Sequence, residues 1–184
     1  MSEIKVLYSE DVVATRVREI GAQISKDFKG ETVDLVCLVD TGHVFMADLI
    51  RTMKIPVRTH FMSMSMREVL DPNYDRERHE VFFYPEIDGA DRIIVIVDGV
   101  LQTGITMDFL LRRIWLREPK QVRTCILVDK LVDRRVLLEI DYTGFALETN
   151  EIVVGYGMSW KGLDGNLPHV GAVTRESAAA GNGN

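Results

Sequence analysis

One segment of the sequence combines the residue types that proteins use to bind a phosphate group. Thr103, Gly104, Ile105 and Thr106 lie between a strongly apolar stretch, residues 92–97, and a helical pattern. Gly104 removes side-chain bulk, so successive backbone N–H groups can converge on an anion, and the two threonines add hydroxyl donors. A helix that begins here points the positive end of its dipole at the same place. A monophosphate would fit without an arginine, and a threonine-capped turn with no ligand explains the segment equally well.

A second segment, residues 39–43 (VDTGH), follows another apolar stretch, residues 33–39 (VDLVCLV). Buried strands of a parallel sheet have this near-continuous apolar character. Ligands of such sheets bind beyond the carboxyl ends of the strands, near a helix N-terminus. Both segments meet that description, so the sequence predicts a ligand site where the two apolar strands end.

The elements that would position these segments alternate along the chain. A helix is expected to begin after Ser9, which is followed by two acidic residues, and to end at Gly30. Further helices are expected at residues 43–53 and from residue 104 onward. Apolar or alternating patterns predict strands at residues 33–39, 57–66, 92–97, 122–128, 142–145 and 152–156. This alternation predicts an α/β fold, with a doubly wound, mainly parallel sheet flanked by helices.

The most polar stretch of the chain, residues 67–80, interrupts this pattern. It is expected to form a mobile excursion, or a solvated hairpin without function, before a returning strand at residues 81–84. Residues 1–173 are interpreted as one domain, and residues 174–184 (TRESAAAGNGN) as a disordered tail.

Composition argues against several classes of function. The 184 residues are 46% apolar and 27% charged, with a formal net charge of −6. This acidic balance argues against binding to nucleic acids or to anionic membranes. The first residues, MSEIKVLYSED, lack the apolar core of a signal peptide, and no apolar run approaches membrane-spanning length, so the cytoplasm is the expected location. Cys37 and Cys125 lie inside apolar runs and are expected to be free, buried thiols, as in a reducing compartment.

Nine passages spread along the chain carry a resemblance to a known family. They are VLYSEDVVATRVREIGAQI, FMADLI, IPV, TGIT, LVDK, RR, DYTGF, VVGYG and NLPHVG. In their order and spacing, the sequence resembles the hypoxanthine-guanine phosphoribosyltransferases from about residue 6 to residue 173. The resemblance implies the type I phosphoribosyltransferase fold with a small C-terminal hood. It also implies transfer of a purine base onto the phosphoribosyl group of PRPP, with release of pyrophosphate and with Mg²⁺ bridging the PRPP oxygens.

The resemblance also assigns binding roles to particular residues. It places the 5′-phosphate at residues 103–106, the six-position oxygen of the purine at Lys130, and backbone contacts with the base at Val153. A lysine ammonium donates to a carbonyl oxygen, and would distinguish a 6-oxopurine from adenine. Without the resemblance, Lys130 is interpreted as a solvated lysine at the end of a strand. Ile152 stands where the family has an aromatic residue on the purine, so it keeps apolar contact and loses ring stacking.

The sequence departs from the family at positions that serve PRPP, metal and proton transfer. Asp98 and Gly99 replace a pair of acidic residues, so one carboxylate remains as a candidate metal ligand. Gln102 replaces the catalytic aspartate, and an amide cannot accept a proton from the purine near neutral pH. Ser159 replaces an aspartate that binds Mg²⁺, and Gly165 replaces an arginine that contacts pyrophosphate.

Two further departures lie in the first half of the chain. Asp40 stands in place of a lysine and would repel pyrophosphate. Met66 and Arg67 stand where the family has the Ser-Tyr pair that begins a closing loop. The resemblance therefore implies Mg²⁺ as the cofactor, while the substitutions argue against it in this chain.

Two hypotheses concern the site itself. The first is a catalytically impaired or non-catalytic homologue that binds a purine nucleotide, or another phosphorylated small molecule, through residues 103–106 and Lys130. The second is an active purine phosphoribosyltransferase of purine salvage with a rearranged site, in which Asp98 is the lone metal ligand. The residues that could be recruited to such a site are Asp40, Asp164 and His43.

A third hypothesis is a regulatory or partner subunit. Apolar surface for a partner is offered by the helix at residues 43–53 and by the Met-rich strand at residues 62–66. Packing within the chain explains both segments as well. Because members of the family are commonly dimers or tetramers, the resemblance implies a homodimer or homotetramer. The sequence identifies neither the ligand nor whether any transfer reaction remains.

Overall fold

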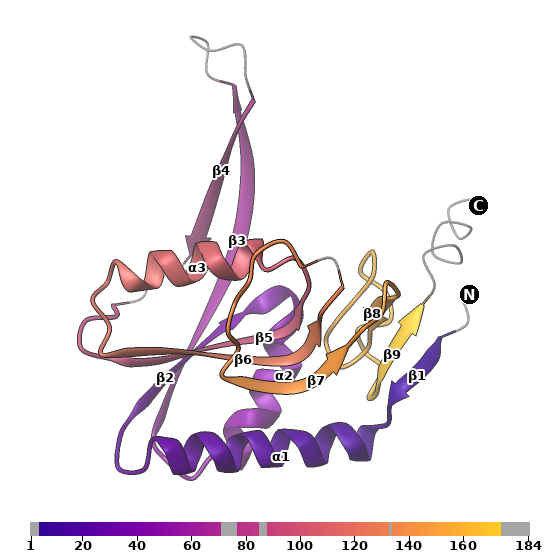
Figure 1. Ribbon diagram of the computed structural model, residues 1–184, viewed down its shortest axis with the longest axis horizontal. Coiled ribbons are helices and arrows are strands. Elements are labelled where there is room, and N and C mark those ends of the chain that lie inside the picture. The colour runs from indigo at the N-terminus through magenta and orange to yellow at the C-terminus, as the bar shows by residue number, and fades with distance from the viewer. Residues whose placement is uncertain (1–3, 71–76, 85–87, 133, 174–184) are drawn as a thin grey trace.

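The computed structural model describes residues 4–70, 77–84, 88–132 and 134–173. Its main feature is a six-stranded sheet with the order β4-β3-β2-β5-β6-β7 (Figure 1). The neighbours β3-β2-β5-β6-β7 are parallel, and β4 is antiparallel to β3. The strands are β2 (Val33–Leu38), β3 (Val57–Leu70), β4 (Glu77–Tyr84), β5 (Ile93–Leu101), β6 (Gln121–Lys130) and β7 (Tyr142–Leu147).

Helices cover both faces of this sheet (Figure 1). The helices α1 (Glu10–Asp27) and α2 (Val39–Thr52) pack on one face, and α3 (Ile105–Trp115) packs on the other. Successive residues of β2 and β5 enter opposite core clusters, which is why these strands read as continuous apolar runs. The predicted doubly wound, mainly parallel α/β sheet flanked by helices is therefore confirmed.

A second, three-stranded sheet forms the small hood beside the main one. Its order is β1 (Lys5–Tyr8), β9 (Val170–Val173) and β8 (Ile152–Val154), all antiparallel. The expected C-terminal hood is thus present, but it includes a strand from the start of the chain, which the sequence did not predict. Because β1 pairs with β9, the two ends of the described chain lie close together (Figure 1).

Several predicted boundaries need correction. The helix expected from His43 begins at Val39, because β2 ends one residue earlier than expected, at Leu38. The strand expected at residues 92–97 continues to Leu101. The strand expected at residues 152–156 ends at Val154, because the next three residues all have positive φ.

Residues on either side of position 70 form a long antiparallel hairpin of β3 and β4 that projects from the body (Figure 1). The returning strand expected at residues 81–84 is confirmed within β4, and much of the stretch 67–80 is itself strand. Residues 71–76 lie outside the described residues, as do the side chains of Met66 and Arg67 and the expected tail 174–184. The predictions made for them, and for one domain over residues 1–173, stay predictions.

The thiols and the apolar segments follow the packing of the core. Cys37 and Cys125 are free and buried, as expected, and burial raises the pKa of the Cys37 thiol to about 12. Five of the described side chains in the segments proposed as an apolar surface for a partner are buried within the chain, so that expectation is wrong for them. They are Phe45, Met46, Leu49, Met53 and Met62. Among the described helices, none has the length and apolar character to span a membrane.

A buried carboxylate fastens the amino ends of three strands. The side chain of Asp34 in β2 is 1% exposed and accepts hydrogen bonds from Arg58 (3.0 Å), His60 (2.7 Å) and Arg92 (2.9 Å). Burial by itself would raise the pKa of Asp34, but these three partners together hold it below its ordinary value. The cluster therefore stabilises the edge of the sheet that lies opposite the predicted ligand site.

Candidate functional site

The predicted phosphate segment forms a tight turn between β5 and α3. Gly104 is the N-cap residue of α3 and has φ of 82° and ψ of −9°, in the left-handed region that favours glycine. The hydroxyl of Thr103 accepts from the backbone N–H of Ile105 at 3.4 Å. Ile105 is half exposed, and Thr103 and Thr106 are partly exposed, so a ligand can reach the turn. The turn thus lies at the start of a helix, where backbone N–H groups are available to an anion, and its binding of phosphate stays a prediction.

The segment after β6 holds this turn in place. The carbonyl oxygen of Thr103 accepts from the backbone N–H groups of Arg135 (2.9 Å) and Val136 (3.1 Å). A Cβ atom added to Gly104 would lie 2.8 Å from the carbonyl oxygen of Val136 and 3.4 Å from the Cδ atom of Arg134. Gly104 is therefore required both by its backbone conformation and by the close approach of this segment.

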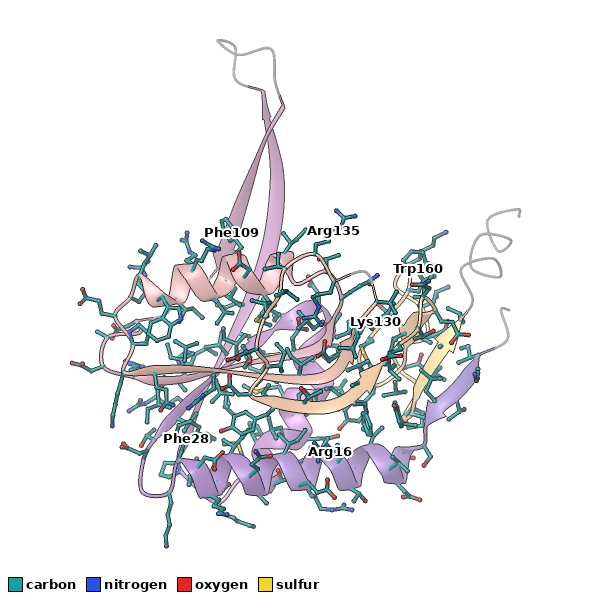
Figure 2. The ribbon with its side chains drawn as sticks, viewed as in Figure 1. Arg16, Phe28, Phe109, Lys130, Arg135 and Trp160 are labelled. Atoms are coloured by element: carbon teal, nitrogen blue, oxygen red, sulfur yellow. The ribbon has the colours of Figure 1, made fainter. Side chains whose placement is uncertain are left out.

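The two arginines that the sequence left unassigned have different positions. Arg134 forms an ion pair with Asp129 of β6, and both side chains are 12% exposed. It also donates to the carbonyl oxygen of Lys130 at 3.2 Å. Arg135 contributes its backbone to the turn and points away from the body of the molecule (Figure 2). In the sheet, Asp129 pairs with Leu101, the residue before Gln102 at the general-base position.

The single carboxylate at the end of β5 faces α2. Asp98 is 8% exposed and accepts hydrogen bonds from the hydroxyl of Thr41 and from the backbone N–H of Gly99 (2.7 Å). Val97 and Val100 both pack into the core cluster beneath α1 and α2, so the alternation of β5 side chains is interrupted between them. The sequence named Asp98 as a weak metal ligand but missed Thr41, because only the strand order brings β2 and β5 together.

Burial dominates the electrostatics of Asp98. Loss of solvent raises the pKa of this carboxyl to about 6. Hydrogen bonds from Thr41 and from the backbone N–H groups of Gly99 and Val100 oppose the rise, and the charge of Asp40 adds to it. Asp40 is exposed in the first turn of α2, as an acidic residue at a helix N-terminus is expected to be.

The environment of Lys130 differs most from what its residue type and place in the sequence predict. It ends β6, as expected, but it is 2% exposed, so its interpretation as a solvated strand-end lysine is wrong. Its Nζ atom donates to the carbonyl oxygen of Glu151 at 2.8 Å, and Figure 2 shows it between the main sheet and the hood. No side-chain pattern could have identified this partner, because the acceptor is a backbone atom.

The hood carries the other residues expected to contact a base. Ile152 is partly exposed and Val153 is buried, and both lie in β8 directly after Glu151. The following turn has three consecutive left-handed residues, with φ of 88° at Gly155, 52° at Tyr156 and 91° at Gly157. This turn directs the chain from β8 back across the hood.

One side-chain hydrogen bond attaches this turn to α2, and the chain beyond it brings two expected site positions together. The hydroxyl of Tyr156 donates to the carboxylate of Asp48 in α2. Ser159 and Gly165, the residues at the expected metal and pyrophosphate positions, lie side by side, since a Cβ atom on Gly165 would be 3.3 Å from that of Ser159. The structure thus brings these two positions together and places a hydroxyl and a glycine there.

The residues proposed for recruitment do not form a metal site. The Nδ1 atom of His43 lies 3.0 Å from the carbonyl oxygen of Val39, one helical turn earlier, as in a structural hydrogen bond. Asp164 lies in the hood with φ of 66°. Among the side chains that the structure describes, at residues 4–63, 88–132 and 134–173, no group of three or more His, Cys, Asp or Glu could hold a metal ion.

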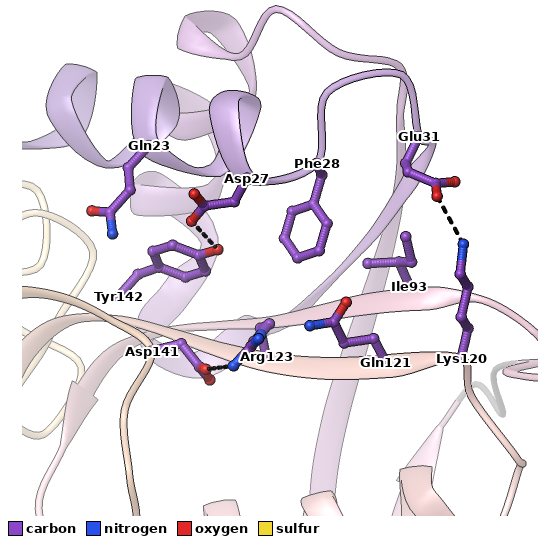
Figure 3. A pocket seen from close by; sticks show the side chains of 10 residues that line it. All are labelled: Gln23, Asp27, Phe28, Glu31, Ile93, Lys120, Gln121, Arg123, Asp141 and Tyr142. Carbon is purple, nitrogen blue, oxygen red and sulfur yellow. Dashed lines mark hydrogen bonds and ion pairs between the residues drawn. The ribbon is translucent and has the colours of Figure 1, made fainter.

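A separate cleft of about 350 Å³ lies at the opposite edge of the sheet, below the C-terminal end of α1 (Figure 3). Its floor includes Ile93, Gln121 and Tyr142, the first residues of three strands. Its charged and phenolic groups are paired with one another. The pairs are Lys120 with Glu31 (2.8 Å), Arg123 with Asp141 (2.6 Å) and Tyr142 with Asp27 (2.9 Å). The cleft is therefore not the site that the sequence predicts.

Known proteins resemble this chain in sequence and structure over almost its whole length. Residues 5–160 match the model of the phosphoribosyl transferase domain. The chain is 32% identical to the hypoxanthine phosphoribosyltransferase of Haemophilus influenzae, over 94% of this chain and 97% of that protein. It is also 32% identical to the enzyme of the same name from Salmonella typhimurium, over 92% and 95% of the two chains. The crystal structure of a hypoxanthine-guanine phosphoribosyltransferase from Bacillus anthracis superimposes with a TM-score of 0.80 at 31% identity, covering 94% of this chain and 99% of that one.

Proposed function

Because this chain belongs to the purine phosphoribosyltransferase family, with the type I fold, we propose that it binds a purine nucleoside monophosphate and transfers phosphoribosyl groups poorly or not at all. The observation that carries the proposal is a contrast within one site. The turn expected to receive a single phosphate is intact, whereas the positions expected to serve PRPP, metal and proton transfer hold Gly99, Gln102, Ser159 and Gly165. Without these groups, we expect the rate of the transfer reaction to fall far more than the affinity for the product nucleotide.

Two features of the site support the binding of a purine nucleotide. The left-handed Gly104 at the start of α3 directs backbone N–H groups at a 5′-phosphate. The buried ammonium of Lys130 provides a donor for the six-position oxygen of hypoxanthine or guanine. Val153 and Ile152 follow in β8, where the base would lie against backbone and an aliphatic side chain.

The residue at the proton-transfer position supports the proposed loss of catalysis. Gln102 can donate and accept hydrogen bonds, but its amide does not accept a proton near neutral pH. Loss of a general base alone lowers a rate by about 10²–10⁴. Asp129, which is held in an ion pair with Arg134, and Asp98, which accepts from Thr41, are the carboxylates on β6 and β5 next to this position in the sheet or in sequence. Neither is placed to take over the role.

The residues at the expected magnesium positions do not fit that ion. Proteins hold Mg²⁺ through one or two carboxylates together with substrate phosphates. Asp98 is buried and turned to Thr41, and Ser159 supplies only a neutral hydroxyl. No step of the proposed function therefore passes through a metal ion.

Titration calorimetry with GMP, IMP and PRPP, with and without Mg²⁺, tests the proposal. We expect GMP and IMP to bind at least about tenfold more tightly than PRPP, a difference of about 1.4 kcal/mol, with no dependence on Mg²⁺. The reason is that the monophosphate uses the intact turn, while the diphosphate of PRPP meets Asp40 instead of a cation. Tight, magnesium-dependent binding of PRPP would contradict the proposal.

An active phosphoribosyltransferase with a rearranged site is the second candidate. It is favoured by the match to relatives that bear enzyme names, at 32% identity over nearly the full length. A coupled assay for nucleotide formation from PRPP and hypoxanthine, guanine or xanthine separates the two candidates. Rapid turnover that Asp98→Asn abolishes would establish the enzyme. A homodimer or homotetramer, which light scattering would reveal alone or in mixture with an active relative, remains a prediction.

Replacing Lys130 by methionine tests the base contact. The variant keeps the length and apolar stem of the side chain but removes the ammonium that donates to Glu151. We expect GMP affinity to fall by about ten- to a hundredfold, the range for a hydrogen bond to a charged group, with AMP affinity nearly unchanged. Lys54→Met, at an exposed lysine beyond α2, is the matched control and should leave both affinities unaltered. Equal loss of GMP and AMP binding would mean that Lys130 does not read the base.

A further inference from the structure

The helix α3 carries apolar side chains on two opposite faces. Its inward face packs on the sheet through three buried residues, Met107, Leu110 and Ile114. On its outward face, a row is formed by Ile105, Phe109, Arg112 and Leu116, which we call the α3 stripe. Because an α-helix turns by about 100° per residue, these four positions lie within about 60° of one another around the helix. They are centred on the side opposite the buried face.

The apolar members of the α3 stripe are open to solvent. Ile105 and Phe109 are about half exposed, and Figure 2 shows Phe109 on the side of α3 away from the sheet. Leu116, the C-cap residue, has helical φ and ψ and is 81% exposed. Leu137, 94% exposed, belongs to the segment that packs on the turn at Gly104, so it extends the row at its Ile105 end. Single exposed apolar residues are common on soluble proteins, but a contiguous row of them marks an interaction surface.

The spacing of the α3 stripe is the same when it is read from either end. Steps of four, three and four residues separate its members in both directions. A second copy of α3 that lies antiparallel to the first, across a two-fold axis, therefore presents the same row in register. Alternating steps of four and three residues are also the spacing at which paired helices interlock their side chains. The row is thus complementary to its own reverse.

The residues that meet in this register suit one another chemically. Ile105 lies opposite Leu116 of the second copy, and Phe109 lies opposite Arg112 of the second copy. A guanidinium over an aromatic ring is a favourable contact, and the arginine stem covers apolar surface. Arg112 also pairs with Asp108, one turn earlier in its own helix, at 2.9 Å. A parallel arrangement would instead place the two Arg112 side chains against each other, and like charges repel.

We propose that α3 is a self-association surface, on which two copies of this chain pack their α3 stripes antiparallel across a two-fold axis. The occupant is a second copy because the row matches its own reverse, a property that an unrelated partner would not require. The four side chains and Leu137 supply less than the roughly 800 Å² per partner of a standard interface, so the contact is reversible, with a dissociation constant in the micromolar range. The inference is independent of the proposed nucleotide binding.

Sedimentation velocity of the full chain, over concentrations that span the micromolar range, tests the contact. We expect Leu116→Glu to weaken self-association at least about a hundredfold and to halve the mass of the largest species. Each pair of copies would lose two apolar contacts and bury two carboxylates. Leu163→Glu is the matched control, because it adds the same charge at an exposed leucine of the hood and should leave the mass unchanged. Thermal melts verify that both variants fold.

Cysteine cross-linking tests the antiparallel register. The double variant Ile105→Cys, Leu116→Cys should form disulfide-linked dimers under mild oxidation, since the two positions face each other across the axis. The native thiols of Cys37 and Cys125 are buried and do not compete. Ile105→Cys alone should remain unlinked, because its two copies would lie about 16 Å apart along the helices, beyond the reach of a disulfide.

Three results would overturn the inference. They are an unchanged mass for a folded Leu116→Glu protein, an equal loss of mass in Leu163→Glu, and cross-linking of Ile105→Cys alone. None of these measurements uses a nucleotide. Failure of the α3 contact therefore leaves the proposed function standing, and failure of GMP binding leaves the α3 contact standing.

Discussion

Gly104→Ala is expected to abolish measurable GMP binding, with a loss of at least about a hundredfold in affinity, which corresponds to about 2.7 kcal/mol. The added methyl group is unfavourable in free energy for two separate reasons. A left-handed backbone, with φ of 82°, costs a non-glycine residue about 1–2 kcal/mol. The Cβ atom would also lie 2.8 Å from the carbonyl oxygen of Val136, which must then move and take the Thr103 carbonyl with it. The backbone N–H groups that would hold the phosphate lose their common direction.

Gly30→Ala is the matched control for this variant. Gly30 has φ of 86°, close to that of Gly104, but no atom lies within 4 Å of a Cβ added there. The two variants therefore share the backbone cost and differ in the clash. We expect Gly30→Ala to lower stability by about 1–2 kcal/mol and to leave GMP affinity unchanged. If a folded Gly104→Ala protein bound GMP within threefold of the unaltered chain, the turn would not be the phosphate site.

Asp34→Asn is expected to lower the free energy of unfolding by about 3 kcal/mol at pH 7. Removing one member of a buried ion pair costs about 3–5 kcal/mol, and the lower end applies because Arg58, His60 and Arg92 are partly exposed. For a chain of this size, the melting temperature should fall by about 6–12 °C. Thermal and denaturant unfolding, followed by circular dichroism, measure the change. Asp88→Asn removes the other, exposed partner of Arg92 and should cost less than about 1 kcal/mol.

The effect of Asp34→Asn should also depend on pH in one direction. Because the folded protein holds the pKa of Asp34 below its ordinary value of 3.8, the folded state favours the ionised carboxylate. The contribution to stability is therefore fully present above pH 3.8 and is lost as pH falls through the lower pKa of the folded state. The difference between the two proteins should be nearly constant above about pH 5 and shrink below about pH 4. A difference that grew toward acid would mean that Asp34 is not held ionised by its partners.

Strands and helices could be predicted from this sequence because their patterns are local. The run at residues 33–39 is apolar at every position but one, and a strand buried on both faces needs that composition. The positions Val13, Val17, Ile20 and Ile24 repeat at helical spacing and are all buried in α1. Boundaries were less accurate. The sequence predicts a helix from residue 43, but Thr41 and Gly42 already belong to α2, whose first turn packs on β5.

Features of the candidate site that lie within one segment of the sequence could be predicted. Contacts between segments that are distant in the sequence could not. The turn at residues 103–106 has its strand, glycine and helix contiguous in sequence, so the pattern contains the whole feature. The partner of Asp98 lies 57 residues away, and that of Lys130 is a backbone carbonyl 21 residues away. Such partners depend on the order of strands in the sheet. Residue types alone therefore suggest an available carboxylate at Asp98 and a solvated amine at Lys130, and the structure places both inside the protein.

The burial of Lys130 affects how strongly its ammonium can hydrogen-bond to a ligand. A surface lysine must shed its water and give up several rotamers each time a ligand arrives, which weakens the resulting contact. Here the backbone of Glu151 already orients the ammonium, and folding has removed most of its hydration. The group is preorganised, so a purine oxygen would gain a donor whose direction is set beforehand. Discrimination between oxo and amino purines should then persist when salt is added, because ions in solution screen a buried charge only weakly.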